Sequence, residues 1–252
     1  MSKLQLADKV ICITGAQGTA GRAAVKLFLE KGASVAACDL KEEEKLGEMK
    51  TFSELFGSER FLYIQADVTD EQQVNEVFSA MEAYFGRLDG LYHNAYVNHY
   101  KRIAEQSLAS WNATINGTLT STFLTCKYAA ELMVKSSGGS IVNNSSILGS
   151  KPLGGNASYG AAKAGLEQFT KVMAVEYADQ GIRANSIVPG DFRTEIDWQT
   201  GTEEFKESMR KTSLIGRSGK PNEINEVAAF LLSDAASYIT GSTYPVTGGL
   251  WL

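Results

Sequence analysis

Short runs of β-forming residues alternate with longer amphipathic stretches along the 252-residue chain. In the stretch 71–85, for example, Val74, Val77 and Met81 recur at the spacing of one helix face. Strands that alternate with helices form βαβ units, so the pattern predicts an α/β fold in which helices cover both faces of a doubly wound parallel sheet. About seven strands are expected, at residues 10–14, 34–38, 61–65, 90–93, 140–144, 183–188 and 243–246.

No proline-rich or low-complexity segment divides the sequence, and its four prolines are scattered. We therefore expect a single domain over residues 1–252. Residues 191–217 are polar, rich in charge and without a strand pattern, which predicts a lid over a substrate site. Long helices are expected at residues 107–134 and 157–177.

Composition narrows the class of ligand. A net charge of -5 and a pI near 5.2 argue against nucleic-acid and anionic-membrane partners, which attract clustered lysine and arginine. The chain has no apolar signal core at its N-terminus and no run of roughly 20 apolar residues, so we expect a cytoplasmic protein with a small-molecule ligand. Cys12, Cys38 and Cys126 lie singly in apolar segments, which predicts buried free thiols. With two histidines in the chain, we expect no metal site.

A glycine-rich turn follows the first predicted strand. Gly15, Gly18 and Gly21 lie between that strand and an apolar helix at 23–30, where backbone N–H groups and the helix dipole would face a pyrophosphate. A tight turn without a ligand would carry the same glycines. Asp39 ends the second predicted strand, where a carboxylate accepts hydrogen bonds from a ribose diol and repels a 2′-phosphate, although it could also be a solvated strand end. The pattern predicts NAD as the cofactor, and NADP less strongly.

Tyr159 and Lys163 stand four residues apart, about one helical turn, so the phenol and the ammonium are expected on one helix face. A phenol keeps its proton to roughly pH 10 unless a fixed positive charge favours the phenolate, and Lys163 would supply that charge. The hydroxyl of Ser146, thirteen residues before Tyr159, would orient a carbonyl or alcohol oxygen while the tyrosine moves its proton. These residues predict carbonyl/alcohol chemistry.

Together these motifs resemble the classical short-chain dehydrogenase/reductase family along essentially the whole chain. Other matching segments are Asp67-Val68, Asn94-Ala95, Pro189-Gly190 with Thr194, and the tail 239–249. The resemblance implies a Rossmann-type, NAD(P)-dependent oxidoreductase in which Tyr159 exchanges the proton, Lys163 holds the nicotinamide ribose and Ser146 positions the reacting oxygen. The cofactor contacts expected from the turn and the resemblance are Gly15, Gln17, Gly18, Thr19, Ala20, Gly21, Asp39, Asp67, Val68, Asn94, Ala95, Tyr159, Lys163, Pro189, Gly190, Phe192 and Thr194.

Two positions near the expected cofactor depart from the family pattern. Thr19 stands where the turn usually has a glycine, so a β-branched side chain is expected to crowd the pyrophosphate. The usual Asn-Asn-Ala-Gly after the fourth strand appears as His93-Asn94-Ala95-Tyr96. A large side chain is therefore expected beside the nicotinamide.

A third departure concerns the predicted catalytic position Thr118, where the family has an asparagine that holds a water of the proton relay. A threonine hydroxyl can still bond a water, so we expect a weakened relay. Asn116 lies two residues away, which is about 200 degrees around a regular helix. It cannot replace the missing group unless the helix is distorted.

We expect oxidation of a secondary alcohol, or reduction of the matching ketone, on a small cyclic, sugar-like or hydroxy-acid compound. Reduction of a 3-oxoacyl thioester is an alternative of the same class. Thr19, Tyr96 and Thr118 leave open an alternative of another class, a binding or regulatory protein with weakened catalysis. Tyr96, Tyr100 and Trp198 are expected to flank the substrate, although each could equally be a packing or interface residue. The family resemblance implies a homotetramer or homodimer.

Overall fold

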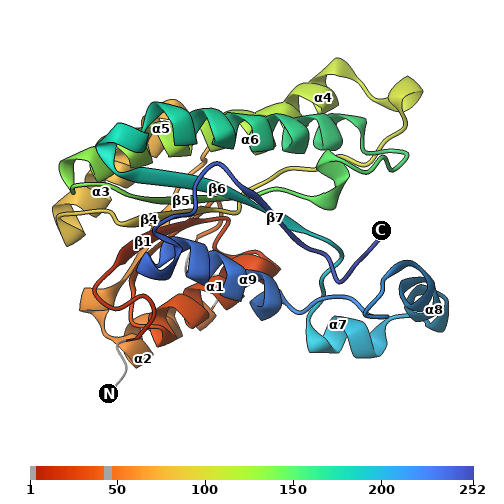
Figure 1. Ribbon diagram of the computed structural model, residues 1–252, viewed down its shortest axis with the longest axis horizontal. Helices are drawn as coiled ribbons and strands as arrows, with labels where there is room; N and C mark the ends of the chain where they lie inside the picture. Colours follow the sequence, from red (N-terminus) through yellow and green to blue (C-terminus); the bar gives the residue numbers. More distant parts are fainter. Residues whose placement is uncertain (1–3, 43–46) are drawn as a thin grey trace.

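The computed structural model describes residues 4–42 and 47–252. Its centre is a seven-stranded sheet in the order β3-β2-β1-β4-β5-β6-β7, in which every neighbouring pair is parallel (Figure 1). The strands are β1 (Val10–Thr14), β2 (Ser34–Asp39), β3 (Phe61–Gln65), β4 (Gly90–His93), β5 (Gly139–Asn144), β6 (Ile182–Pro189) and β7 (Thr243–Val246). The predicted α/β fold with a doubly wound parallel sheet is confirmed, and no strand end differs from its prediction by more than one residue.

Helices cover both faces of the sheet (Figure 1). One face carries α1 (Thr19–Glu30), α2 (Gly47–Phe56) and α9 (Pro221–Leu232), and the other carries α3 (Glu71–Phe85), α5 (Ser121–Lys135) and α6 (Ala157–Glu176). Local signals set the ends of α3: Asp70 accepts a hydrogen bond from the N–H of Gln73 at 3.0 Å, and Gly86 adopts the left-handed conformation that ends a helix.

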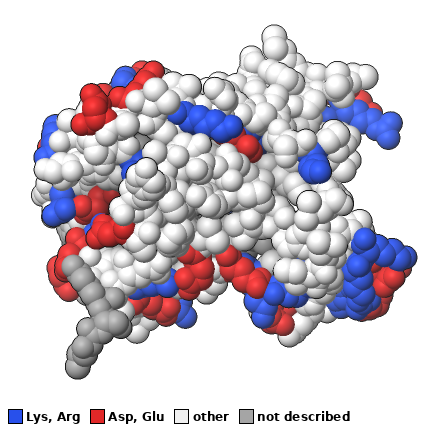
Figure 2. Space-filling model, viewed as in Figure 1, with Lys and Arg blue, Asp and Glu red and all other residues white. Residues whose placement is uncertain are grey.

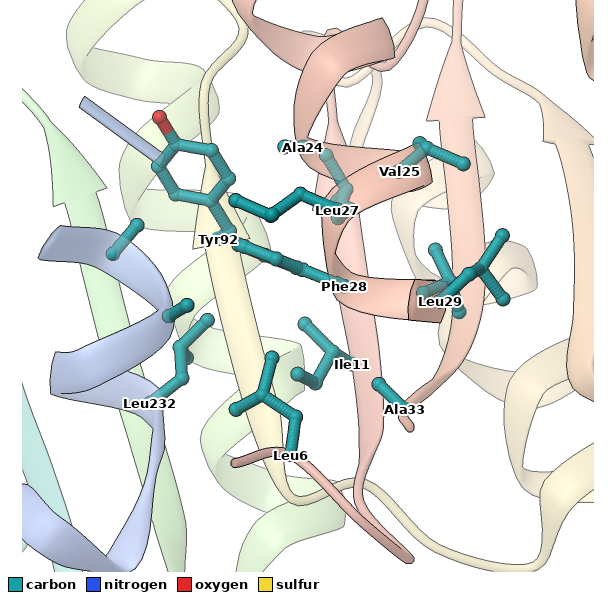
Figure 3. Packing of buried hydrophobic residues seen from close by; sticks show 14 of the residues in the cluster. Leu6, Ile11, Ala24, Val25, Leu27, Phe28, Leu29, Ala33, Tyr92 and Leu232 are labelled. Atoms are coloured by element: carbon teal, nitrogen blue, oxygen red, sulfur yellow. The ribbon is translucent and has the colours of Figure 1, made fainter. Parts of the chain in front are cut away.

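The core lies in two layers, one on each side of the sheet. Between the sheet and the helices α1 and α9, the rings of Phe28 and Tyr92 pack with centroids 5.9 Å apart (Figure 3). The layer on the other face contains Cys12, Cys38 and Cys126, which are buried free thiols, as predicted. All five residues of β1 are buried, as a strand covered on both faces requires.

The order of the strands reverses between β1 and β4. The chain runs from β1 outwards to β2 and β3 and then returns to β4 on the other side of β1. In open α/β sheets a ligand binds at such a reversal, beyond the carboxyl ends of the strands. The residues that follow these two strands meet there, because the side-chain amide of Asn94 donates a 3.3 Å hydrogen bond to the carbonyl of Gly15.

The helix expected at residues 107–134 is interrupted, which corrects that prediction. It consists of α4 (Leu108–Ile115), a π-helical turn (Asn116–Thr120) and α5. The loop after β4 packs tightly on this turn, since a Cβ at Gly117 would lie 2.3 Å from Cγ2 of Val97. The distortion thus lies where the chain approaches the crevice, as π-helical turns often do at functional sites.

Residues 191–217 form two short helices, α7 (Glu195–Thr200) and α8 (Glu203–Thr212), at one end of the molecule near the C-terminus (Figure 1). Acidic and basic side chains gather on α8, whereas the middle of this face is mostly uncharged (Figure 2). The function of this segment as a lid stays a prediction. Within residues 4–42 and 47–252, no helix is both long and apolar enough to cross a membrane.

Candidate active site

A cleft of about 690 Å³ lies at the carboxyl ends of the strands. It extends from the end of β2 to the segment that follows β6. The predicted site residues that line it are Gly15, Gly18, Thr19, Ala20, Asp39, Asp67, Val68, Asn94, Ala95, Tyr96, Ser146, Tyr159, Lys163, Pro189, Gly190 and Phe192. The fold therefore brings the glycine turn and the Ser-Tyr-Lys set into one cavity.

Ser146, Tyr159 and Lys163 meet at the centre of the cleft. Tyr159 and Lys163 share a buried face of α6, and their side chains are 9% and 1% exposed. Ser146 follows β5, and its hydroxyl forms a hydrogen bond with the phenol of Tyr159. The Nζ atom of Lys163 lies 5.6 Å from the centre of the Tyr159 ring and donates a 2.6 Å hydrogen bond to the backbone carbonyl of Asn144.

Burial controls the protonation of the lysine and the tyrosine. It lowers the pKa of Lys163 from 10.5 to about 7, and the charge of Glu167 partly opposes this change. Burial also raises the pKa of Tyr159 above its ordinary value; Tyr96 adds to the rise, and the hydrogen bond with Ser146 opposes it. The predicted lowering of the Tyr159 pKa is therefore wrong for the protein alone, because burial of the phenolate outweighs the opposing effect of Ser146.

Asp39 lies at the β2 end of the cleft. Its carboxylate accepts hydrogen bonds from the backbone N–H groups of Gln17 at 2.8 Å and Lys41 at 3.2 Å, which fix it beside the glycine turn. The side chain of Gln17 is buried away from the cleft and donates a hydrogen bond to the phenol of Tyr63. Gln17 therefore holds Asp39 in place, and its side chain does not line the predicted cofactor site.

The glycine turn has a shape that fits a dinucleotide pyrophosphate. Gly15 has a φ of +62°, and a Cβ at Gly21 would lie 2.1 Å from the carbonyl oxygen of Gly15, so glycine alone lets α1 start this close to β1. Gly21 accordingly packs behind the turn and does not line the cleft. Gly18 and Thr19 at the start of α1 do line it, so the helix N-terminus faces the space where a phosphate would bind.

Thr118 is fully buried beside the cleft but does not line it. Its hydroxyl donates a 2.9 Å hydrogen bond to the carbonyl of Val97 and accepts a 3.1 Å hydrogen bond from the N–H of the same residue. Asn116 is exposed, and its side-chain oxygen accepts a hydrogen bond from Thr120 at 3.3 Å. Thr118 therefore holds the loop after β4 on the π-helical turn, and its function in a proton relay stays a prediction.

Three other predicted site residues lie away from the cleft lining. The hydroxyl of Thr194 caps α7, Tyr100 packs on Gly155, and Trp198 packs on Phe205 with ring centroids 6.1 Å apart. The expected contacts of Thr194 with the cofactor, and of the two aromatic residues with the substrate, stay predictions.

Asn144 is a site residue that sequence reasoning missed. Its side-chain amide donates a 2.5 Å hydrogen bond to Oδ1 of Asn94, whose own amide contacts the Gly15 carbonyl. Together with the bond from Lys163 to the Asn144 backbone, these contacts connect the lysine to the glycine turn. The Oδ1 atom of Asn144 is buried and has no hydrogen-bond partner among the described residues. The one sequence signal is a pair of asparagines, Asn143 and Asn144, at the end of an apolar strand.

Comparison with known proteins identifies the family. The pattern of the family described as Enoyl-(Acyl carrier protein) reductase matches residues 15–251. The chain is 38% identical over 245 residues to 2,5-dichloro-2,5-cyclohexadiene-1,4-diol dehydrogenase of Sphingobium indicum, and the match covers 97% of both chains. It is 36% identical over 251 residues to 3-oxoacyl-[acyl-carrier-protein] reductase of Thermotoga maritima, covering 98% of this chain and 99% of that protein.

A solved structure agrees with these sequence matches. A short-chain type dehydrogenase/reductase from Mycobacterium ulcerans superposes with a TM-score of 0.89 at 28% identity, over 98% of this chain and 90% of that chain. The cleft, its Ser-Tyr-Lys set and these similarities favour an enzyme over a regulatory binding protein. The chain belongs to the short-chain dehydrogenase/reductase family and is an NAD(P)-dependent oxidoreductase.

Proposed function

We propose that this protein is an NAD-dependent dehydrogenase that interconverts a secondary alcohol and a ketone on a small cyclic compound. The observation that carries the proposal is the position of Ser146, Tyr159 and Lys163 in the same cleft as the glycine turn and Asp39. The 38% identity to a protein named as a cyclohexadiene diol dehydrogenase supports a cyclic alcohol as the substrate.

The residues of the chain supply a path for the proton. The Oγ atom of Ser146 accepts a 3.2 Å hydrogen bond from the N–H of Leu148, which fixes this oxygen beside Tyr159, where its hydroxyl would bind the reacting oxygen. Tyr159 takes the proton of the alcohol during oxidation and returns it during ketone reduction. Lys163 favours the phenolate of Tyr159 when its own amine is protonated. A bound nicotinamide supplies the acceptor or donor of the hydride.

The environment of Asp39 supports NAD over NADP. A 2′-phosphate on the adenosine ribose would approach the negative carboxylate, which two backbone N–H groups hold in place. The phenol of Tyr63 accepts a hydrogen bond from Gln17 and donates one to the carbonyl of Lys41, which fixes the two segments that hold the carboxylate. The charge of Asp39 thus disfavours the extra phosphate.

Reduction of a 3-oxoacyl thioester is the second candidate. The 36% identity to the Thermotoga maritima reductase supports it, because that match covers nearly all of both proteins. The two candidates differ in the shape of the substrate: a thioester carries its ketone on a long linear chain, whereas a cyclic alcohol is compact. The side chain of Tyr96, which lies over the reaction centre, favours the compact substrate.

A two-stage experiment tests the proposal. Thermal unfolding with NAD, NADH, NADP and NADPH should show the largest rise in Tm with NAD or NADH, because a ligand that binds only the folded state stabilises it. Absorbance of the nicotinamide is then followed with cyclic alcohols, linear alcohols and a 3-oxoacyl thioester. Turnover with cyclic alcohols alone supports the first candidate, turnover with the thioester alone supports the second, and the absence of any nucleotide effect contradicts both.

We also propose a homotetramer or homodimer built on the helices α5 and α6. Phe123 on α5 and Val172 and Val175 on α6 are 46%, 41% and 80% exposed, and apolar side chains grouped on adjacent helices are unfavourable in water. Light scattering after size-exclusion chromatography measures the assembly. Val175→Glu should shift it towards the monomer, and an unchanged mass would exclude α6 from the interface.

A further inference from the structure

Tyr96 forms a compact cluster with the two catalytic groups. Its ring centroid lies 5.7 Å from that of Tyr159, and the Nζ atom of Lys163 lies 5.5 Å from the centre of the Tyr96 ring and 5.6 Å from that of Tyr159. The three distances describe a nearly equilateral triangle. Tyr96 itself is 56% exposed and lines the cleft, so its ring covers the lysine from the solvent side.

Lys163 has few other groups that stabilise its charge. Its Nζ atom is hydrogen-bonded to the carbonyl of Asn144, and no ion pair joins it to a carboxylate among the described residues. Glu167, whose negative charge acts on the lysine, instead accepts a 2.7 Å hydrogen bond from Ser145. A buried ammonium with one carbonyl partner is costly, and the face of an aromatic ring within about 6 Å offsets part of that cost.

We propose that Tyr96 is a positioning residue for the catalytic lysine, whose ring face stabilises the ammonium of Lys163 in the cofactor-free enzyme. The inference rests on the proposed function, in which the charged lysine favours the phenolate of Tyr159. It also gives a function to Tyr96, whose large side chain stands where the family pattern has a glycine. The ring and not the hydroxyl carries the effect, because the quadrupole of the ring attracts the cation.

Lys163 is the basic group of the cluster, and its charge changes around neutral pH. On β4, His93 is buried with its pKa lowered to about 3, so it stays neutral above about pH 5. On α6, burial raises the pKa of Tyr159, while the carboxylate of Glu167 opposes the lowering at the lysine. The pKa of Lys163 is about 7, and loss of the Tyr96 ring removes an attraction for the charged form, which lowers this pKa further.

The experiment compares the pH dependence of kcat/KM for NAD in three proteins, since kcat/KM reports the ionisations of the free enzyme. In the wild type and in Tyr96→Phe, kcat/KM should fall at the same pH on the alkaline limb of the profile, where Lys163 loses its proton. In Tyr96→Leu, which keeps apolar bulk without a ring, that limb should move to lower pH by roughly half a unit to one unit. Tyr84→Leu on α3, another half-exposed tyrosine outside the cleft, is the matched control and should leave the limb in place.

Two results would overturn the inference: a Tyr96→Leu profile that superposes on the wild type, or a shift in Tyr96→Phe as large as in Tyr96→Leu. Thermal unfolding establishes that each variant folds, and Tyr96→Met, with the same expected shift, replaces the leucine variant if that protein does not fold. If the wild type is active and Tyr96→Leu has the same pH profile, the inference about Tyr96 is refuted while the proposed function stands. Full activity of Tyr159→Phe would instead refute the proposed function.

Discussion

The hydroxyl of Thr118 bonds twice to the backbone of Val97, accepting from its N–H at 3.1 Å and donating to its carbonyl at 2.9 Å. Val97 follows Tyr96 directly, so this pair of bonds holds the segment that carries the tyrosine over the reaction centre. The contact lies on the π-helical turn, whose Gly117 gives Val97 the space to approach. A residue that departs from the family pattern thus has a clear structural function.

Removing the Thr118 hydroxyl should destabilise the protein. Thr118→Val keeps the shape of the side chain but leaves the N–H and carbonyl of Val97 without these partners, which costs about 1–3 kcal/mol for each group that stays buried and unsatisfied. Urea denaturation measures the loss in the free energy of unfolding. Thr118→Ser keeps the hydroxyl and serves as the control. Equal stability of the valine variant and the wild type would show that these bonds contribute nothing.

Neutralising Asp39 should relax the choice of cofactor. Asp39→Asn keeps an oxygen for the N–H of Gln17 but removes the charge that a 2′-phosphate would meet. We expect the Kd for NADPH to improve by roughly tenfold, or about 1.4 kcal/mol, with a smaller change for NADH. Isothermal titration with both nucleotides measures the effect. Persistent rejection of NADPH by the variant would show that the charge of Asp39 does not set the selectivity.

A methyl group at Gly21 should disrupt the turn without touching the Ser-Tyr-Lys set. Its Cβ would lie 2.1 Å from the carbonyl oxygen of Gly15, so the turn must move. The rise in Tm on addition of NADH should be lost in Gly21→Ala. Gly154→Ala is the matched control, because a Cβ there has no atom within 4 Å. A normal response of the Gly21 variant to NADH would contradict the assignment of the turn to the cofactor.

His93 should make the stability of the protein depend on pH below neutrality. Its pKa in the folded protein is lowered to about 3, chiefly by burial and then by the charge of Lys163. The unfolded state therefore binds more protons between about pH 6.5 and 3, and stability falls as pH falls through this window. For His93 alone the loss between pH 7 and pH 5 is about 2 kcal/mol.

The free energy of unfolding of His93→Asn, measured at the same two pH values, isolates the contribution of His93. Other titrating groups, such as Lys163, contribute equally to the wild type and to the variant. The asparagine variant should lose less stability than the wild type over the interval. Parallel losses in the two proteins would show that the imidazole is not held neutral by the fold.

Features that depend on near neighbours in the chain were predictable from the sequence. The strands, the glycine turn and the face shared by Tyr159 and Lys163 follow from residue patterns within a few turns or a single strand, and the structure has them where expected. The position of Asp39 was equally predictable, because a carboxylate at a strand end stays at the carboxyl edge of a parallel sheet.

Features that depend on contacts between distant segments were not predictable. The π-helical turn arises where Val97 packs on Gly117, and the helical pattern from 107 to 134 continues through it. The pKa of Tyr159 depends on how deeply α6 is buried, which four-residue spacing does not reveal. Trp198 lies away from the cleft because it packs on Phe205 of the neighbouring helix.

The proton transfer assigned to Tyr159 is tested most directly by Tyr159→Phe, which removes one hydroxyl and keeps the ring. The variant should bind NADH as the wild type does in a thermal-shift titration, because the turn, Asp39 and Lys163 remain. Its kcat should fall by roughly 10² to 10⁴, the range that a positioned acid or base contributes. Turnover equal to that of the wild type, with NADH binding intact, would contradict the assignment of Tyr159 as the catalytic acid and base.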